Sequence, residues 1–299
     1  MDINWYPGHM AKAKRLLADQ LSRVDVVVEL CDARLPYSSR NPDLDKLLAG
    51  KKRVLLLNKA DLADPAATSA WLNYFRAQGI DAAPYSASTG KAKDALAVID
   101  RAAKEAVERA AQKGIRKTVK AMVVGVPNVG KSTFTNKLHG GNIAKTGDRP
   151  GVTRANQWVR ITPYLDLLDT PGLLWPRLDD QLAARRLCYI GTVKDDVVDL
   201  AMLTIHLLQD MLKVQPQAVM TRFRFDNPEL RGEELLEAVC KGGVCDYDRC
   251  CAVVLDEFRA GKLGRMTLEM PVKKARLTIP GAKKDDENKP QEENSDGED

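Results

Sequence analysis

The feature that most constrains the fold is a phosphate-binding loop in the middle of the chain. The apolar segment Val119–Val124 leads into Gly125-Val126-Pro127-Asn128-Val129-Gly130-Lys131-Ser132, and a helix-like segment follows as far as Leu138. This is the pattern G-x-x-x-x-G-K-[ST] between a strand and a helix. Its glycines let backbone N–H groups turn toward phosphate oxygens, and the helix adds the positive end of its dipole. The pattern therefore predicts a nucleoside triphosphate site rather than a chance glycine-rich turn.

Each position in this loop has an expected role. Lys131 can reach the β- and γ-phosphates, and the Ser132 hydroxyl can bind Mg²⁺. The backbone that should surround the phosphates is supplied by Asn128, Val129, Gly130, Lys131, Ser132 and Thr133.

A second phosphate element follows about forty residues later. The segment Leu165–Leu168 has the character of a strand and ends in Asp169-Thr170-Pro171-Gly172. We expect Asp169 to hold Mg²⁺ through water, and the Gly172 N–H to lie near the γ-phosphate.

A candidate base-recognition element precedes the phosphate loop. Asn58-Lys59-Ala60-Asp61 ends a buried strand, and Ser86-Ala87 ends the next one. The Asp61 carboxylate can accept hydrogen bonds from both N1–H and N2–H of guanine, whereas adenine lacks the N1–H. We expect the Lys59 stem to lie along the base, and a backbone N–H of Ser86-Ala87 to donate to the guanine carbonyl. The other interpretation of Asn58–Asp61 is an ordinary helix cap.

The order of these elements predicts a rearranged α/β fold. Ras-like domains begin with the phosphate loop, whereas here the base-recognition segments come first, as in a circular permutation. Strands alternate with helices, which predicts a parallel sheet covered on both faces. The predicted strands are 26–30, 53–57, 80–85, 119–124, 157–161 and 165–168, and the predicted helices are 10–24, 43–48, 65–78 and 94–113.

The pattern becomes purely helical beyond Asp179. Helices are predicted over 181–189, 197–214, 233–241 and 247–260, followed by a basic, loop-like stretch over 261–284. We therefore predict a GTPase-type α/β domain over 1–175, an all-α domain over 176–280 and an acidic, disordered tail over 281–299.

Charge is unevenly distributed along the 299 residues. The formal net charge is +5, and residues 285–299 contribute −7, which leaves +12 on residues 1–284. A basic body suggests a polyanionic partner such as nucleic acid, although a merely solvated basic surface fits the charge equally well. The N-terminus lacks a signal-peptide pattern and no apolar run could span a membrane, so we expect a cytoplasmic protein with reduced thiols.

Several histidines and cysteines are candidate metal ligands. The spacing of Cys240, Cys245, Cys250 and Cys251 lacks the C-x₂-C pair of zinc sites, so buried free thiols are predicted. His206 lies on the apolar face of a helix and is expected in the core. From residue types alone, His9 belongs to a surface helix entrance and has no function.

Six short motifs then occur in a fixed order: Trp5-Tyr6-Pro7-Gly8-His9-Met10, Asp32-Ala33-Arg34-x-Pro36, Asn58-Lys59-x-Asp61, Gly125-x-Pro127-Asn128-Val129-Gly130-Lys131-Ser132, Arg149-Pro150-Gly151-x-Thr153 and Asp169-x-Pro171-Gly172. In content and order they resemble the circularly permuted GTPases of the ribosome biogenesis GTPase A (YlqF-like) family. Phe258-Arg259-x-Gly261-x-Leu263-Gly264 is similar to the C-terminal domain of that family.

The resemblance implies a GTPase that helps mature the large ribosomal subunit and is stimulated by that particle, with the helical domain contacting rRNA. It implies that Thr153 meets Mg²⁺ and the γ-phosphate, and that Asn128 binds a K⁺ ion. Leu173 stands where Ras-like proteins carry a water-orienting glutamine, and His9 matches the histidine proposed to replace it. GTP or GDP, Mg²⁺ and K⁺ are thus the expected ligands, and ribosomal proteins and rRNA the expected partners of a monomer, without DNA or membrane.

Two other functions stay open at this stage. One is an RNA-binding scaffold with a slow or regulatory nucleotide site. The other is an ATP-using kinase or ATPase, against which Asn58 and Asp61 argue.

Overall fold

The structure is a computed structural model that describes residue 15 and residues 17–141, 143, 157–172, 180–243 and 246–271. Several predicted features lie outside these ranges: His9, Thr153, Leu173, Cys245, the boundary near Trp175 and the acidic tail. Of the predicted first helix, residues 17–21 are described as helical, and Leu17 and Leu21 are buried.

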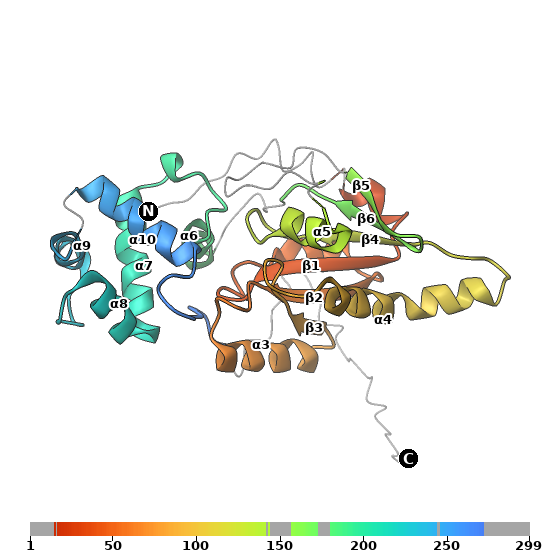
Figure 1. The fold of residues 1–299 in the computed structure, drawn as a ribbon, viewed down its shortest axis with the longest axis horizontal. Helices are drawn as coiled ribbons and strands as arrows, with labels where there is room; N and C mark the ends of the chain where they lie inside the picture. The colour runs from red at the N-terminus through yellow and green to blue at the C-terminus, as the bar shows by residue number, and fades with distance from the viewer. Residues whose placement is uncertain are drawn as a thin grey trace, which may run out of the picture.

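A six-stranded sheet forms the centre of the nucleotide-binding part, in the order β3-β2-β1-β4-β6-β5 (Figure 1). All neighbouring strands are parallel except β5, which pairs antiparallel with β6 at one edge. The predicted strands are confirmed, with bounds β1 Val26–Asp32, β2 Lys52–Asn58, β3 Asp81–Pro84, β4 Val119–Val124, β5 Gln157–Thr162 and β6 Leu165–Asp169.

Helices cover both faces of this sheet, which is why its central strands are apolar on both sides. β1 is buried along its whole length. Its residues Val26, Val28 and Leu30 belong to the core that also contains residues of α4 (Ala92–Ala111) and α5 (Lys131–His139). The opposite face packs on residues 17–21, on α2 (Pro42–Leu47) and on α3 (Pro65–Ala77).

The second part of the chain is helical and lies beside one end of the sheet (Figure 1). It consists of α6 Gln181–Tyr189, α7 Leu200–Val214, α8 Pro216–Phe223, α9 Gly232–Lys241 and α10 Tyr247–Arg259. One contiguous apolar core runs from a face of the sheet into these helices.

Two details of the helical prediction were wrong. The helix predicted from Val197 begins at Leu200, because the Asp199 side chain accepts a hydrogen bond from the Met202 N–H and caps it there. Residues 195–197 form a separate 3₁₀ turn. The additional helix α8 begins at Pro216, which suits a first helical turn because proline needs no N–H partner there.

The basic stretch after α10 packs against the sheet part. Its residues 263–269, here called the strap, return to the sheet part and are mostly buried. The Leu268 N–H donates to the Arg34 carbonyl at 2.9 Å, and the Trp71 indole donates to the Glu269 carbonyl at 2.8 Å. The strap therefore binds α3 and the loop after β1 to the helical part.

The Glu269 carboxylate is the polar centre of this contact. It is buried and accepts hydrogen bonds from the Tyr37 N–H at 2.7 Å, from Ser38 and from Arg186 of α6 at 3.3 Å. Burial raises the pKa of Glu269, against the hydrogen bonds from Ser38 and the charge of Arg186.

The other predictions about single residues are resolved as follows. Cys240, Cys250 and Cys251 are buried with free thiols, as predicted. His206 is only partly buried, so it lies at the rim of the helical core rather than inside it; burial lowers its pKa. Among the helices that the structure describes, none is both long enough and apolar enough to cross a bilayer.

Glu269→Ala tests the strap. The variant leaves Arg186 and two backbone N–H donors without their buried acceptor, so we expect the free energy of unfolding to fall by about 2–4 kcal/mol. Urea denaturation measures this loss. Glu229→Ala is the matched control, because Glu229 is 82% exposed in its ion pair with Arg231 and should change stability by less than about 0.5 kcal/mol. Equal stabilities of the two variants would contradict this role of the strap.

Candidate nucleotide-binding site

The predicted nucleotide-binding segments meet at one edge of the sheet. Parallel strands place their carboxyl ends together, and ligands of open α/β sheets bind there. Here β2 ends at Asn58, β4 leads into the phosphate loop, and β6 ends at Asp169. The described chain thus brings together the three segments that sequence reasoning assigned to one site.

The phosphate loop has the backbone that its glycines predict. Gly130 has a φ of +97° and caps α5, and a Cβ there would lie 2.5 Å from the Asn58 side-chain nitrogen. Asn128 also adopts a left-handed conformation, with a φ of +63°. Close approach of the β2 end to the loop thus requires glycine at position 130.

Lys131 points into the loop. Its ammonium donates to the Val126 carbonyl at 2.9 Å, and the side chain is buried. Burial lowers the pKa of Lys131 to about 8, although the charge of Asp169 acts in the opposite direction. A phosphate in the loop would restore full protonation, because it supplies a negative charge beside the ammonium.

Ser132 and Asp169 fit a hydrated magnesium ion. The Ser132 hydroxyl donates to Asp169 Oδ2 at 3.0 Å, which places the two oxygens side by side. Asp169 Oδ1 is buried and has no hydrogen-bond partner within the described chain. Burial raises the pKa of Asp169, opposed by Lys131 and Ser132. When bound, Mg²⁺ neutralises charge on the phosphate oxygens.

Gly172 lies directly against the phosphate loop. A Cβ at this position would be 2.7 Å from backbone atoms of Pro127, so no side chain fits. The Thr170 hydroxyl donates to the Val123 carbonyl at 2.6 Å and fixes the same turn to β4. The segment after Asp169 is therefore held beside the loop, where a γ-phosphate is expected.

Asn58 joins the base-recognition segments to the phosphate loop. Its amide donates to the Val129 carbonyl at 2.7 Å, and its oxygen accepts from the Ala87 N–H at 2.8 Å. A backbone N–H of Ser86-Ala87 was expected at a guanine carbonyl, and of these two donors the Ala87 N–H is bonded to Asn58 in this structure. Ser86 is also in place, where its hydroxyl accepts from Thr89 at 2.8 Å.

Asp61 has an unsatisfied acceptor, as expected of a residue that recognises guanine. Its Oδ1 is buried and without a hydrogen-bond partner in the described ranges. A buried carboxylate oxygen without a donor is costly, and the N–H groups of guanine would satisfy it. Its backbone carbonyl accepts from Arg265 at 3.0 Å, so the strap region also supports this turn.

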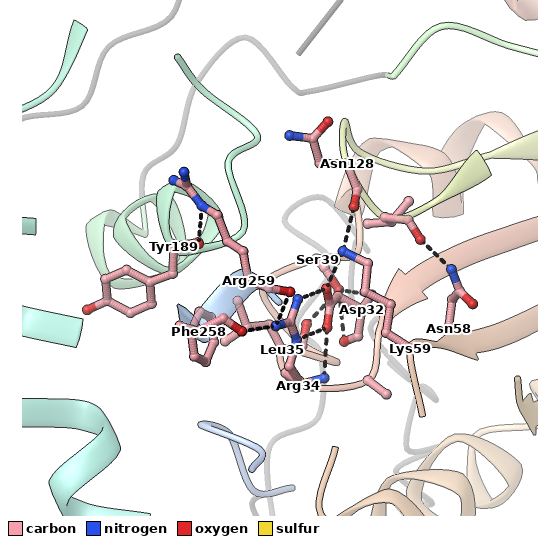
Figure 2. Close-up of polar contacts among 12 residues, drawn as sticks. Asp32, Arg34, Leu35, Ser39, Asn58, Lys59, Asn128, Tyr189, Phe258 and Arg259 are labelled. Atoms are coloured by element: carbon pink, nitrogen blue, oxygen red, sulfur yellow. Dashed lines mark hydrogen bonds and ion pairs between the residues drawn. The ribbon is translucent and has the colours of Figure 1, made fainter. Parts of the chain in front are cut away.

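The sequence did not predict the contacts of Asp32 and Arg34, which it placed only in a loop and in a family motif. Asp32 is buried and pairs with Arg34 at 2.8 Å and with Lys59 at 3.2 Å. Burial would raise the pKa of Asp32, but Arg34 and Lys59 outweigh it and hold that pKa well below its usual range. Figure 2 shows Arg34 between Asp32 and the backbone of Phe258 and Arg259. The signal available in the sequence was an Asp-x-Arg directly after a buried strand.

Asn128 has a contact that the sequence did not predict. Its side-chain amide donates to the Gly191 carbonyl, just after α6. Its own backbone carbonyl accepts from the Lys59 ammonium at 2.8 Å. The residue expected to bind K⁺ is therefore also a contact between the phosphate loop and the helical part.

The phosphate loop, the Ser132–Asp169 pair and the unsatisfied Asp61 oxygen, all on this sheet, are the features of one class of protein. The strand that feeds the phosphate loop is fourth in the chain but lies at the centre of a Ras-like strand order. The fold is therefore that of a circularly permuted P-loop GTPase domain, followed by an all-α part.

Comparisons with known proteins agree. A family described as 50S ribosome-binding GTPase matches residues 120–224. Ribosome biogenesis GTPase A of Bacillus cereus is 45% identical over 280 residues, covering 91% of this chain and 95% of that protein. The protein of that name from Thermotoga maritima is 31% identical, covering 90% and 95%. The GDP-bound structure of T. maritima YlqF superposes with a TM-score of 0.63 at 26% identity, covering 85% of this chain and 97% of that one. The chain belongs to the ribosome biogenesis GTPase A family, and it hydrolyses GTP.

The lowered pKa of Lys131 predicts that nucleotide binding takes up a proton. At pH 8 about half of the Lys131 side chains in the free protein should be protonated. Phosphate binding should protonate the rest, so about 0.5 proton is taken up per GDP. At pH 7 the uptake should fall to about 0.1. Calorimetry of GDP binding in two buffers of different ionisation enthalpy measures both values. The affinity should decrease as the pH rises above about 8. Zero uptake at both pH values would show that Lys131 is already fully charged in the free protein.

Proposed function

We propose that this protein is a GTP-driven assembly factor that binds the precursor of the large ribosomal subunit, promotes its late maturation, and is stimulated by that particle. The observation that carries the proposal is the 45% identity to Ribosome biogenesis GTPase A over 91% of the chain. The description of the matching family as 50S ribosome-binding supports the choice of subunit.

The charge of the chain supports an RNA-rich partner. Residues 1–284 carry a formal charge of +12, because residues 285–299 contribute −7 to the whole-chain value of +5. A basic surface attracts rRNA phosphates regardless of sequence. We propose that the helical part supplies the main rRNA contact and that ribosomal proteins complete the site, with the protein acting as a monomer in the cytoplasm.

Hydrolysis is proposed to combine residues from both ends of the GTPase domain. Lys131 and the loop N–H groups stabilise charge on the phosphates, while Ser132, Asp169 and Thr153 hold Mg²⁺. Asn128 binds a K⁺ ion that adds a further positive charge. His9 orients the attacking water, because leucine at position 173 has no group that could do so.

The alternative is an RNA-binding scaffold whose nucleotide site is slow and only regulatory. The buried acceptors of Asp61 and Asp169 favour a working site, since a degenerate one would have no reason to leave both without protein donors. An ATP-using enzyme is disfavoured by the same Asp61 oxygen.

Asp61→Asn tests the guanine reader. An asparagine can accept N1–H but offers an N–H₂ donor where guanine presents its own amino group, so GTP affinity should fall about 30-fold to 150-fold. Xanthine carries a carbonyl at that position, and the variant should therefore prefer XTP. Competition with a fluorescent GDP analogue measures both affinities.

Asp81→Asn is the matched control, because Asp81 is exposed and pairs with Arg101 at the start of β3, at the opposite end of the strand from the site. It should bind GTP as the wild type does. Unchanged GTP preference in Asp61→Asn would contradict the assignment of Asp61.

Stimulation by the particle tests the proposed function itself. In K⁺ buffer, purified large subunits should raise the GTP hydrolysis rate of the wild type, and His9→Ala should lose most of this stimulation while keeping its GTP affinity. Replacing K⁺ by Na⁺ should slow the stimulated reaction if Asn128 binds the cation. Small subunits are the matched control. A wild-type rate that large subunits leave unchanged would favour the scaffold.

A further inference from the structure

We propose that Asp32 and Arg34 couple guanine-nucleotide binding to the attachment of the helical part, so that the site senses the base rather than the γ-phosphate. The inference rests on the proposed function only in requiring that a guanine nucleotide binds at Asn58–Asp61. It assigns Arg34 as a positioning residue that acts through Asp32 and Lys59.

Arg34 reaches across to the end of α10. Its guanidinium donates to the Phe258 carbonyl at 2.6 Å and to the Arg259 carbonyl at 3.3 Å, and it lies 4.8 Å from the centre of the Phe258 ring. Helix C-termini carry unpaired carbonyls and partial negative charge, which a buried cation stabilises. Arg34 is 1% exposed, so water does not compete for these contacts.

Asp32 fixes the same guanidinium from the other side. Its two oxygens accept from Arg34 Nε at 2.9 Å and from Arg34 Nη2 at 2.8 Å, which is a two-point contact with defined geometry. The Asp32 N–H donates to Ser39 Oγ at 2.9 Å, which holds the backbone of the same turn. The orientation of Arg34 therefore depends on the position of the Asp32 carboxylate.

Lys59 makes that carboxylate part of the nucleotide site. Its ammonium lies 3.2 Å from Asp32 Oδ2 and 2.8 Å from the Asn128 carbonyl, in the sequence segment that reads the base (Figure 2). A guanine ring stacked on the Lys59 stem would restrict this side chain. One buried carboxylate thus contacts both a base-reading lysine and the arginine that holds α10.

A second contact reaches the same part of the helical region. Asn128 donates to the Gly191 carbonyl, and Arg259 donates to the Tyr189 carbonyl at 3.0 Å and to the Cys188 carbonyl at 3.1 Å. The ends of α6 and α10 are therefore joined to each other by Arg259 and to the nucleotide site by Arg34 and Asn128. Because Lys59 also donates to the Asn128 carbonyl, a base that orders Lys59 would order both helix ends.

Two consequences distinguish this coupling from a γ-phosphate switch. GDP and GTP should have the same effect on the end of α10, because both carry the base. By reciprocity, weakening the attachment of α10 should weaken the binding of either nucleotide by the same factor, about fivefold or more.

The test is hydrogen exchange of residues 254–261 in the full-length protein with no nucleotide, with GDP and with a non-hydrolysable GTP analogue, in the wild type and in Arg34→Lys. Lysine keeps the charge beside Asp32, but its single nitrogen cannot reproduce the two-point contact with the carboxylate while it also reaches the two carbonyls. In the wild type, GDP and the analogue should slow exchange equally. In Arg34→Lys, both nucleotides should bind about fivefold more weakly or worse, and exchange at α10 should no longer respond to them.

Arg231→Lys is the matched control, because Arg231 bonds only to its own neighbours in the helical part in the contacts described. Phe258→Leu is the second variant if Arg34→Lys fails to fold: it removes the ring beside the guanidinium and should reduce the response partially. A response at α10 to the GTP analogue alone, or a normal response in Arg34→Lys, would overturn the proposal. Failure of the wild type to bind GDP at all would instead refute the nucleotide site.

Discussion

The arrangement of the sheet part and the helical part depends on the ion pairs of the buried Asp32 carboxylate. A charge at 0% exposure is costly unless it is paired, and here two cations from different sides pair with it. Such a group adds little net stability compared with apolar packing, but it admits few alternative geometries. The loop after β1 is thus fixed in one position. From there Arg34 donates to a carbonyl of α10, and its own carbonyl accepts from the Leu268 N–H. The N–H groups of Tyr37 and Ser38 donate to Glu269.

The permuted chain order gives that loop its importance. In the Ras-like order, the strand that corresponds to β1 follows the phosphate elements; here it comes before them, and the helical part follows directly after the Asp169–Gly172 segment. The polypeptide link to the helices therefore leaves from the γ-phosphate side. Arg34 and the strap add contacts from the base side, and Asn128 adds one from the phosphate loop, so the helical part is connected to both ends of the nucleotide site.

Local sequence patterns were sufficient for the strands of the sheet, whose arrangement brings the phosphate loop, Asn58 and Asp169 to one edge. Most strands were predicted because an apolar run of strand length ended in residues with a known chemical use, such as Asn58 or Asp169, whereas β5 was predicted from alternating residues. The contacts between the parts could not be predicted in this way. Arg34 and Phe258 are 224 positions apart, and Trp71 and Glu269 are 198 apart, so neither periodicity nor spacing connects them. The ion pairs of Glu29 were not predicted either, because Glu29 lies within the apolar strand β1. It is buried and paired with Arg40 at 3.2 Å and with Arg53 at 3.4 Å.

Asn58 shows how the local and the long-range constraints combine. Its amide can satisfy the Val129 carbonyl only because Gly130 has no side chain, and its oxygen reaches Ala87 only because β3 ends beside β2. The base-recognition turn, the phosphate loop and the loop after β3 are therefore held by one side chain, and the next residue, Lys59, links them to Asp32. A ligand that fills this edge of the sheet contacts segments already bonded to the helical part. Binding of the ligand and attachment of the helical part should therefore stabilise each other.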